Sequence, residues 1–87
     1  MASTPSPPVV QKVVADAAQR AGVPAEQVRV VRVEEREWRD SSLGCPEPGK
    51  VYTQVITPGL LVLVEAGGRQ YEYHTGRGES FVLCSRP

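Results

Sequence analysis

Residues 60–75 read LLVLVEAGGRQYEYHT, and this stretch predicts a β-hairpin. Its first five residues are all apolar, which is typical of a strand buried on both faces in the middle of a sheet. The Gly-Gly pair at residues 67–68 tolerates the positive φ angles of a tight hairpin turn. In the second strand, at residues 69–75, Tyr71 and Tyr73 alternate with polar residues and so share one face. We therefore expect this hairpin to form the centre of a sheet.

Residues 8–21 predict the one helix of the chain. Five small apolar residues recur at the spacing of a single helical face, namely Val10, Val13, Val14, Ala17 and Ala21. Ser6 is expected to cap the start of this helix, and Gly22 is expected to end it in a left-handed conformation. Pro24 prevents the helix from resuming, and residues 24–27 predict one short further turn.

Three more strands are predicted from β-branched and aromatic residues. Residues 28–38 predict the first strand, in which the alternation of valines slips by one position and indicates either a β-bulge near residues 30–31 or a change of burial along the strand. Residues 51–57 predict a second strand, which a type II turn at residues 58–59 separates from the hairpin. Residues 81–84 predict a short last strand.

The order of these elements indicates the fold class. Strands that follow one another through short connections pair in antiparallel fashion, and a single helix has to cover the apolar face of their sheet. The sequence therefore predicts one α+β domain over residues 8–87, with an N-terminal helix packed on a four- to five-stranded antiparallel sheet. Residues 1–7 are rich in proline and serine and are expected to form a disordered lead-in.

Charge and hydropathy argue against two classes of partner. The 87 residues include ten basic and ten acidic side chains, so the chain lacks the basic excess of a nucleic-acid-binding protein. The longest apolar run, at residues 60–64, is far shorter than the roughly 20 residues of a membrane-spanning helix. We therefore expect no nucleic acid and no membrane insertion, and either a monomer or a weak dimer. No cofactor-binding motif is recognisable, so no cofactor is expected.

Cys45 and Cys84 are the only cysteines of the chain. Cys45 lies in a proline-bounded loop at residues 39–50, and Cys84 ends the last predicted strand, so both lie where the fold would otherwise fray. A disulfide between them would stabilise the fold by about 4 kcal/mol according to chain-entropy theory. The positions favour a Cys45–Cys84 disulfide, and with it an oxidising compartment.

Two alternatives for the cysteines stay open. They could be two reduced thiols, since free cysteine behaves as a small hydrophobic residue. They could also belong to a metal site or to a nucleophilic site with His74 as the base. Zinc needs four ligands with recognisable spacing, which Cys45, His74, Cys84 and Asp40 do not show. We therefore expect neither a metal site nor catalysis.

The loop carries the most specific pattern in the sequence, WRDSSLGCPEPG at residues 38–49. Together with YEYHT at residues 71–75 and the closing Cys84, this pattern resembles that of small uncharacterised bacterial domains found in secreted proteins and lipoproteins. The resemblance implies an extracytoplasmic setting, behind a signal sequence that has been removed, and it implies no activity. A cytoplasmic location is the alternative.

The predicted function is that of a non-catalytic extracytoplasmic module, which binds a protein partner through the loop at residues 39–50. A loop stiffened by prolines and a disulfide loses little entropy on binding. One version is a protease inhibitor that presents Leu43 or a neighbouring residue. The alternatives are a structural spacer domain of a cell-surface protein and, least favoured, an enzyme that uses Cys45 and His74. The expected binding surface consists of Trp38, Asp40, Leu43, Pro46, Pro48 and Tyr52.

Overall fold

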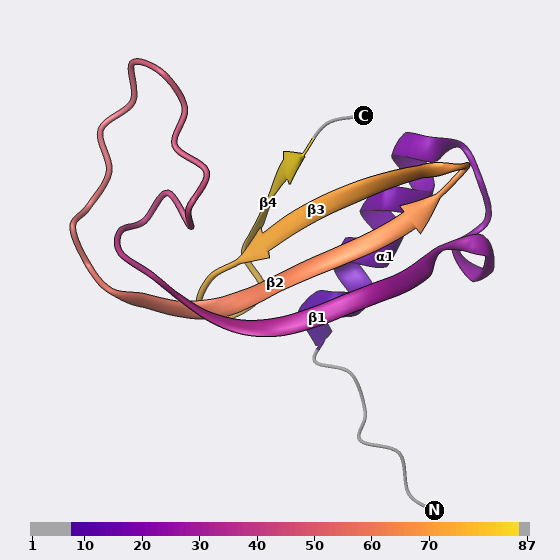
Figure 1. Cartoon of the computed structure of the whole chain (residues 1–87), viewed down its shortest axis with the longest axis horizontal. Coiled ribbons are helices and arrows are strands. Elements are labelled where there is room, and N and C mark those ends of the chain that lie inside the picture. The colour runs from indigo at the N-terminus through magenta and orange to yellow at the C-terminus, as the bar shows by residue number, and fades with distance from the viewer. Residues whose placement is uncertain (1–7, 86–87) are drawn as a thin grey trace, which may run out of the picture.

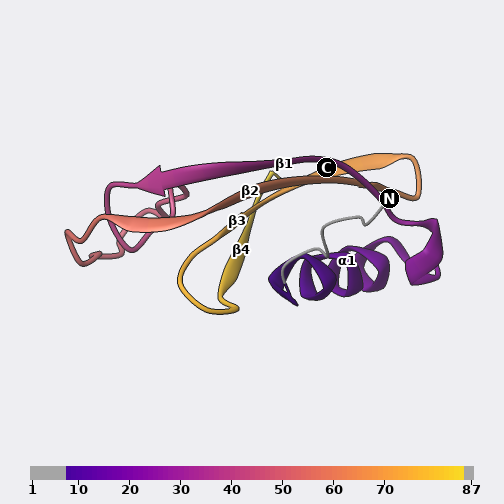
Figure 2. The same cartoon turned by 90° about the horizontal axis from the view of Figure 1, so that it is seen from below.

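One helix packs on one face of a four-stranded antiparallel sheet in the computed structural model, which describes residues 8–85. The strands are adjacent in sequence order, so the sheet is a simple meander; the helix lies behind the sheet in Figure 1 and below it, along one face, in Figure 2. This arrangement confirms the predicted α+β class. The expected helix cap, Ser6, lies outside the described residues. The elements are α1 (Pro8–Ala21), the 3₁₀ turn η1 (Ala25–Gln27), β1 (Arg29–Trp38), β2 (Thr57–Ala66), β3 (Arg69–Thr75) and β4 (Phe81–Ser85).

The helix α1 has the predicted bounds and ends as predicted. Gly22 adopts a φ of 72°, and the amides of Gly22 and Val23 both donate to the Ala18 carbonyl. These two bonds satisfy a carbonyl that the end of the helix leaves without an intrahelical partner. The side chains that α1 buries against the sheet are Val9, Val10, Val13, Ala17 and Ala18. Val14 and Ala21 are only half-buried, so the buried stripe is shifted slightly from the predicted one.

The core lies between α1 and the central hairpin of β2 and β3. Val62 and Val64 on β2 and Tyr71 and Tyr73 on β3 all face the helix and are buried. The Gly-Gly turn joins the two strands with φ angles of 59° and 78°, as a tight hairpin turn requires. The hairpin is therefore the centre of the fold, as its sequence predicts. No helix within residues 8–85 is both long and apolar enough to cross a membrane.

The predicted bulge in β1 is confirmed. Val30 pairs with Val64 and Arg32 with Leu63, so the register between β1 and β2 shifts at Val31. Beyond the bulge the pairing continues in register to the end of the strand. The extra residue places Val30 beside Val64 and Val33 beside Val62, on one face of the sheet, which explains the slip in the alternation of the valines.

The predicted strand at residues 51–57 and the turn at residues 58–59 are wrong. Residues 39–56 form one long loop beyond the end of the sheet, visible at the left of Figure 1. Their β-branched residues have no sheet to pair with or core to face, and Val51 is 98% exposed. Pro58 and Gly59 lie inside β2 instead, paired with Glu37 and Arg36 of β1.

The glycine at residue 59 is needed for close packing rather than for a turn. A Cβ at this position would collide with the carbonyl oxygen of Thr75 and would come 2.7 Å from Nε1 of Trp38. Pro58 is tolerated because β3 begins to pair with β2 only at Leu61, so no neighbour on that side requires an amide at residue 58. The Pro-Gly pair thus allows Trp38 to lie across the sheet.

Candidate functional site

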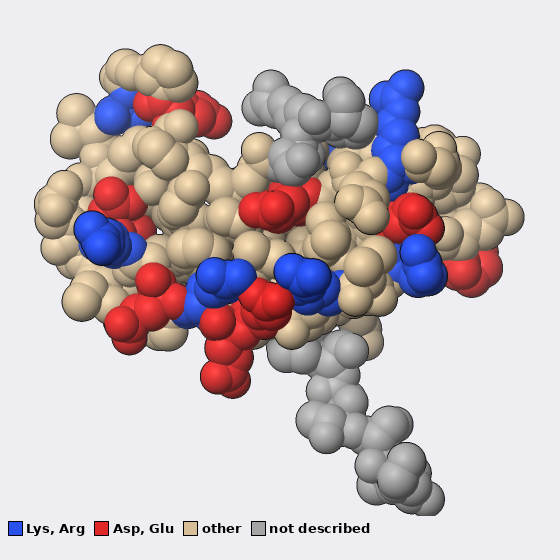
Figure 3. Space-filling model, viewed as in Figure 1, with Lys and Arg blue, Asp and Glu red and all other residues tan. Residues whose placement is uncertain are grey.

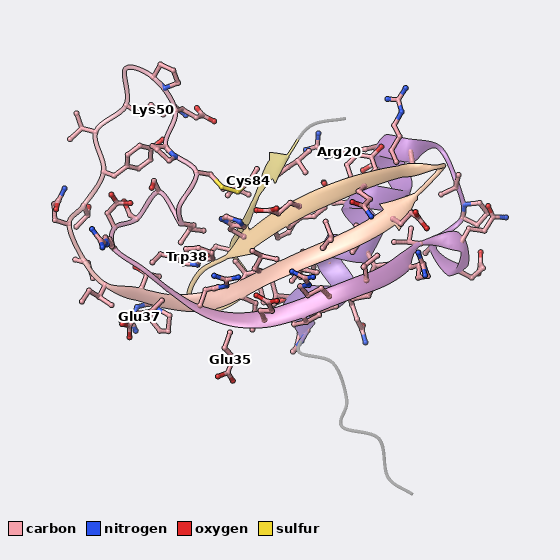
Figure 4. All side chains as sticks on the ribbon, in the orientation of Figure 1. Arg20, Glu35, Glu37, Trp38, Lys50 and Cys84 are labelled. Atoms are coloured by element: carbon pink, nitrogen blue, oxygen red, sulfur yellow. A yellow bond between two sulfur atoms is a disulfide. The ribbon has the colours of Figure 1, made fainter. Side chains whose placement is uncertain are left out.

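The long loop at residues 39–56, called the braced loop below, is joined to the sheet by a disulfide. Cys45 of this loop and Cys84 of β4 are bonded, with their Cα atoms 5.7 Å apart, which confirms the predicted pairing. The sulfur–sulfur bond is visible beside the Cys84 label in Figure 4. The bond holds the braced loop against β4, which is the short edge strand of the sheet.

The first turn of the braced loop is built around Asp40. Its carboxylate accepts hydrogen bonds from the backbone amide of Ser42, at 2.9 Å, and from the Ser42 hydroxyl. The hydroxyl first, and then the amide, hold the pKa of Asp40 below its usual value. Leu43 then adopts a φ of 57° and Gly44 a φ of 77°, and the Leu43 side chain is only 7% exposed. The Asp-Ser-Ser-Leu-Gly part of the motif therefore folds the loop back on itself.

The far side of the braced loop is tied to the first turn by two hydrogen bonds. The Ser41 amide donates to the Thr53 carbonyl, and the Thr53 amide donates to the Ser41 hydroxyl, each at 2.9 Å. Nearer the tip, the Glu47 amide donates to the Tyr52 hydroxyl at 2.9 Å. Lys50 forms an ion pair with Glu47 at 2.8 Å, which raises the pKa of Lys50. The loop is thus cross-connected along its length.

Trp38 and His74 form the base on which the braced loop rests. Their rings are stacked, with centroids 4.4 Å apart and planes inclined by 12°. Trp38 also donates from Nε1 to the Thr75 carbonyl at 2.8 Å, which fixes the indole across the end of the sheet. His74 lies on the face of β3 away from α1 and is 7% exposed.

The two ring nitrogens of His74 each face an oxygen that only accepts hydrogen bonds. Nδ1 lies 2.7 Å from the Leu43 carbonyl oxygen, and Nε2 lies 2.7 Å from a carboxylate oxygen of Glu72. The sulfur of Cys45 is 3.1 Å from Nδ1, so the imidazole lies directly beside the disulfide.

The structure brings together three side chains that sequence spacing does not connect. The ligand atoms of Cys45, His74 and Cys84, called the Cys–His cluster below, all lie within 4.8 Å of one another. The three residues come from the loop, β3 and β4, so no local motif signals their proximity. Asp40, the fourth residue considered from the sequence, is occupied with Ser42. Glu72, which contacts His74, was not identified from the sequence.

A cavity of about 500 Å³ opens between the braced loop and β4. The Cys–His cluster forms part of its wall, together with Lys50, Tyr52 and Glu72. Figure 3 shows the hollow beside the loop, with acidic and basic side chains on its rim. The disulfide is thus accessible to small molecules from this side.

The six residues expected to form a binding surface are divided by the structure. Pro46 and Pro48 are exposed, whereas Trp38, Asp40 and Tyr52 are half-buried. Leu43 is buried, so its inclusion in an exposed surface is wrong, because the left-handed turn directs its side chain inward against Gly76. Three exposed apolar residues of the loop were missed because their pattern resembles a strand, namely Val51, Val55 and Ile56.

A family described as a domain of unknown function, DUF8738, matches residues 10–84. The chain belongs to this family. The match covers the sheet, the braced loop and both cysteines of this DUF8738 domain, as well as nearly all of α1. No curated protein matches the chain. No solved structure matches it either.

Proposed function

We propose that this DUF8738 domain is a non-catalytic, extracytoplasmic module that binds a protein partner through the tip of the braced loop. The observation that carries the proposal is Val51, an apolar side chain that is 98% exposed on a loop held in place by covalent and polar contacts. Single exposed apolar residues are common on protein surfaces, but here Ile56 is also 60% exposed and Val55 is 47% exposed on the same loop.

The braced loop is also pre-organised for binding. The disulfide, the Asp40–Ser42 turn and the Ser41–Thr53 pair restrain the loop before any partner arrives. A restrained loop loses less conformational entropy on binding than a free one, so more of the contact energy appears as affinity. The disulfide also supports the extracytoplasmic setting, because disulfides persist in oxidising compartments.

The contact surface proposed here differs from the one expected from the sequence. It consists of the exposed tip residues Pro46, Pro48, Lys50 and Val51, with Tyr52 at its edge. A protease inhibitor that presents Leu43 is not retained, because that side chain is buried. The partner that fits this tip is a protein with a shallow apolar depression, since the one cation at the tip, Lys50, is paired with Glu47.

Site-specific photo-crosslinking tests the proposal. A photoreactive residue at position 51 is expected to give a discrete adduct with a protein of the extracytoplasmic fraction of the source organism, and Val51→Asp in a competing unlabelled domain is expected to lose its ability to suppress that adduct. Val31 is the matched control position, because it is also an exposed valine, at 41%, but lies in β1 away from the loop. Identical adducts from positions 51 and 31, or none from position 51, would reject the proposal.

A purely structural spacer domain is the second candidate. It is favoured by the Asp40–Ser42 contacts and by the left-handed Leu43 and Gly44, because these motif residues stabilise the loop itself. The crosslinked adduct separates the two candidates, and the melting temperature of the Val51→Asp variant shows that this competitor is folded. A binding role predicts an adduct that Val51→Asp no longer suppresses although its melting temperature is unchanged, whereas a spacer role predicts no adduct from any position.

A further inference from the structure

The Cys–His cluster contains the side-chain types that bind zinc. Thiolate sulfur and imidazole nitrogen are its preferred protein ligands, at bond lengths of about 2.3 and 2.1 Å. Tetrahedral ligands at those lengths lie roughly 3.6 Å from one another. The ligand atoms of Cys45, His74 and Cys84 lie within 4.8 Å of one another while the sulfurs are bonded, so separation of the two sulfurs is the main change that a tetrahedral arrangement requires.

Glu72 supplies the support that a metal-binding histidine usually has. Its carboxylate lies 2.7 Å from Nε2 of His74 and leaves Nδ1 beside the sulfur of Cys45, at 3.1 Å, and the Leu43 carbonyl oxygen, at 2.7 Å. Histidines that bind a metal commonly donate their other ring N–H to a carboxylate, which fixes the orientation of the ring. The stacked Trp38 ring restricts the same imidazole from its flat side.

We propose that the dithiol form of this domain binds one Zn²⁺ ion through the sulfurs of Cys45 and Cys84 and through Nδ1 of His74. The disulfide form has no such site, because both sulfur atoms are then bonded to each other. The inference goes beyond the proposed binding of a protein partner and does not depend on it.

The chemistry that interconverts the two forms is thiol–disulfide exchange. Two molecules of a small thiol supply two electrons and two protons, the bond between Cys45 and Cys84 breaks, and the small thiol leaves as its own disulfide. When Zn²⁺ binds, both cysteine thiols lose their protons to solvent, and Nδ1 coordinates the metal as the nitrogen of a neutral imidazole. In the metal-bound form Nε2 carries the ring proton and donates to the Glu72 carboxylate, which lies 2.7 Å away. Both cysteines line the cavity of about 500 Å³, which gives a small thiol access to them.

Three protein ligands leave one coordination position of the metal vacant. The cavity beside the cluster provides water for that position. The Leu43 carbonyl oxygen lies 2.7 Å from Nδ1 in the disulfide form and has to move away when that nitrogen binds the metal. The first turn of the braced loop therefore has to adjust slightly when the metal binds.

Cobalt titration of the whole protein tests the site. The domain is reduced with a phosphine under anaerobic conditions and titrated with Co²⁺, whose visible bands report tetrahedral thiolate coordination, and Zn²⁺ is then added to displace it. We expect one equivalent of Co²⁺ to bind to the reduced protein, complete displacement by one equivalent of Zn²⁺, and no bands with the oxidised protein. Native mass spectrometry checks the stoichiometry.

Two variants distinguish a three-ligand site from adventitious binding by two thiols. Glu72→Gln retains the fold and all three ligands, and we expect Zn²⁺ affinity to fall about 10- to 100-fold, measured by competition with a chromophoric chelator. Glu79→Gln is the matched control, because Glu79 is an acidic residue that pairs with Lys12 and lies outside the cluster. His74→Phe keeps a ring against Trp38 and removes the nitrogen ligand, so we expect it to lose the one-to-one complex.

Absent or non-specific metal binding by the reduced protein would rule out the zinc site. Reduced wild-type protein that binds no Co²⁺, or that binds it no more tightly than His74→Phe, would reject the proposal. If His74→Phe fails to fold, equal Zn²⁺ affinities of Glu72→Gln and Glu79→Gln would reject it as well, because both variants retain both thiols and His74. None of these outcomes depends on whether the loop tip binds a protein.

Discussion

Tyr73 and Asp16 form the polar contact that connects the sheet to α1. The Tyr73 hydroxyl donates to a carboxylate oxygen of Asp16 at 2.7 Å, and Arg20 donates to the same oxygen from one turn further along the helix. Burial first, and then the bond to Asp16, raise the pKa of Tyr73. Burial alone would raise the pKa of Asp16, but the bonds from Tyr73 and Arg20 outweigh it and lower that pKa.

These two pKa shifts give the domain a stability that depends on pH at both extremes. The pKa of Tyr73 is higher in the folded than in the unfolded protein. The contribution of Tyr73 to the free energy of unfolding is therefore complete below the unfolded pKa of about 10 and is lost as the pH rises above that value. The pKa of Asp16 is lower in the folded than in the unfolded protein. The contribution of Asp16 to the free energy of unfolding is therefore complete above the unfolded pKa of about 3.9 and is lost as the pH falls toward the folded pKa.

The Tyr73→Phe variant tests this contact. We expect it to be less stable than wild type by about 1.5 kcal/mol at neutral pH, since a hydrogen bond to a charged group is lost. We also expect its loss of stability between about pH 9 and pH 11 to be smaller than that of wild type. Urea unfolding across this range measures both effects, with Tyr71→Phe, at the other buried tyrosine of β3, as the matched control. Parallel pH profiles for all three proteins would contradict the assignment.

Among the elements, β1 shows how a single extra residue is accommodated. Val31 falls outside the register, while Val30 pairs with Val64 and Arg32 with Leu63, which are neighbours on β2. The bulge therefore separates two correctly paired stretches without changing the face that either presents. A bulge on an edge strand also disrupts the regular backbone edge that another chain could join.

Deletion of Val31 is expected to be tolerated. It joins Val30 directly to Arg32, whose partners on β2 are already adjacent, so both registers survive. We expect a loss of less than about 1 kcal/mol in the free energy of unfolding. Deletion of Val33 forces the rest of the strand to slip by one residue, which turns its side chains to the opposite face of the sheet. We therefore expect it to lower the free energy of unfolding far more than deletion of Val31 does, with both variants measured by urea unfolding. Equal losses for the two deletions would show that Val31 is not a true bulge residue.

At the scale of the whole molecule, the braced loop is attached to the sheet through the disulfide, the His74 contacts and the packing of Leu43 and Gly44 against the end of the sheet. The sheet and α1 share a core, whereas the loop lies beyond the end of that core (Figure 2).

On the sheet face away from α1, Leu61 and Leu63 are half-buried, and ion pairs such as Arg29–Glu65 lie beside them. We expect a monomer or at most a weak dimer, which sedimentation equilibrium measures.

Removal of the disulfide should lower the stability of the molecule substantially. For the Cys45→Ala/Cys84→Ala double variant, whose two positions are 39 residues apart, we expect a loss of about 4 kcal/mol on the chain-entropy estimate. This is a large share of the roughly 5–15 kcal/mol that stabilises a typical domain. Thermal and urea unfolding measure the loss, and chemically reduced wild type without metal is the control. A double variant as stable as oxidised wild type would show that the disulfide does not brace the fold.

The features that the sequence determined by itself are those that depend on neighbouring residues. The bounds of α1 follow from helical spacing and from the glycine at residue 22, and the hairpin follows from a Gly-Gly pair between two apolar or alternating stretches. The slip in the valines of β1 indicated either a bulge or a change of burial, and the structure contains the bulge. The Cys45–Cys84 pairing was predicted from where the two cysteines lie relative to these elements, and the structure confirms it.

Only the tertiary structure decided the features that depend on which distant segments meet. Residues 51–56 have the composition of a strand, but they lie past the end of the sheet and have no strand to pair with. The Pro-Gly pair at residues 58–59 reads as a turn, yet the indole of Trp38 and the Thr75 carbonyl occupy the space that a side chain at residue 59 would need. Likewise, the Cys–His cluster exists because a loop and two strands converge at one end of the sheet, and no spacing within any one of them indicates it.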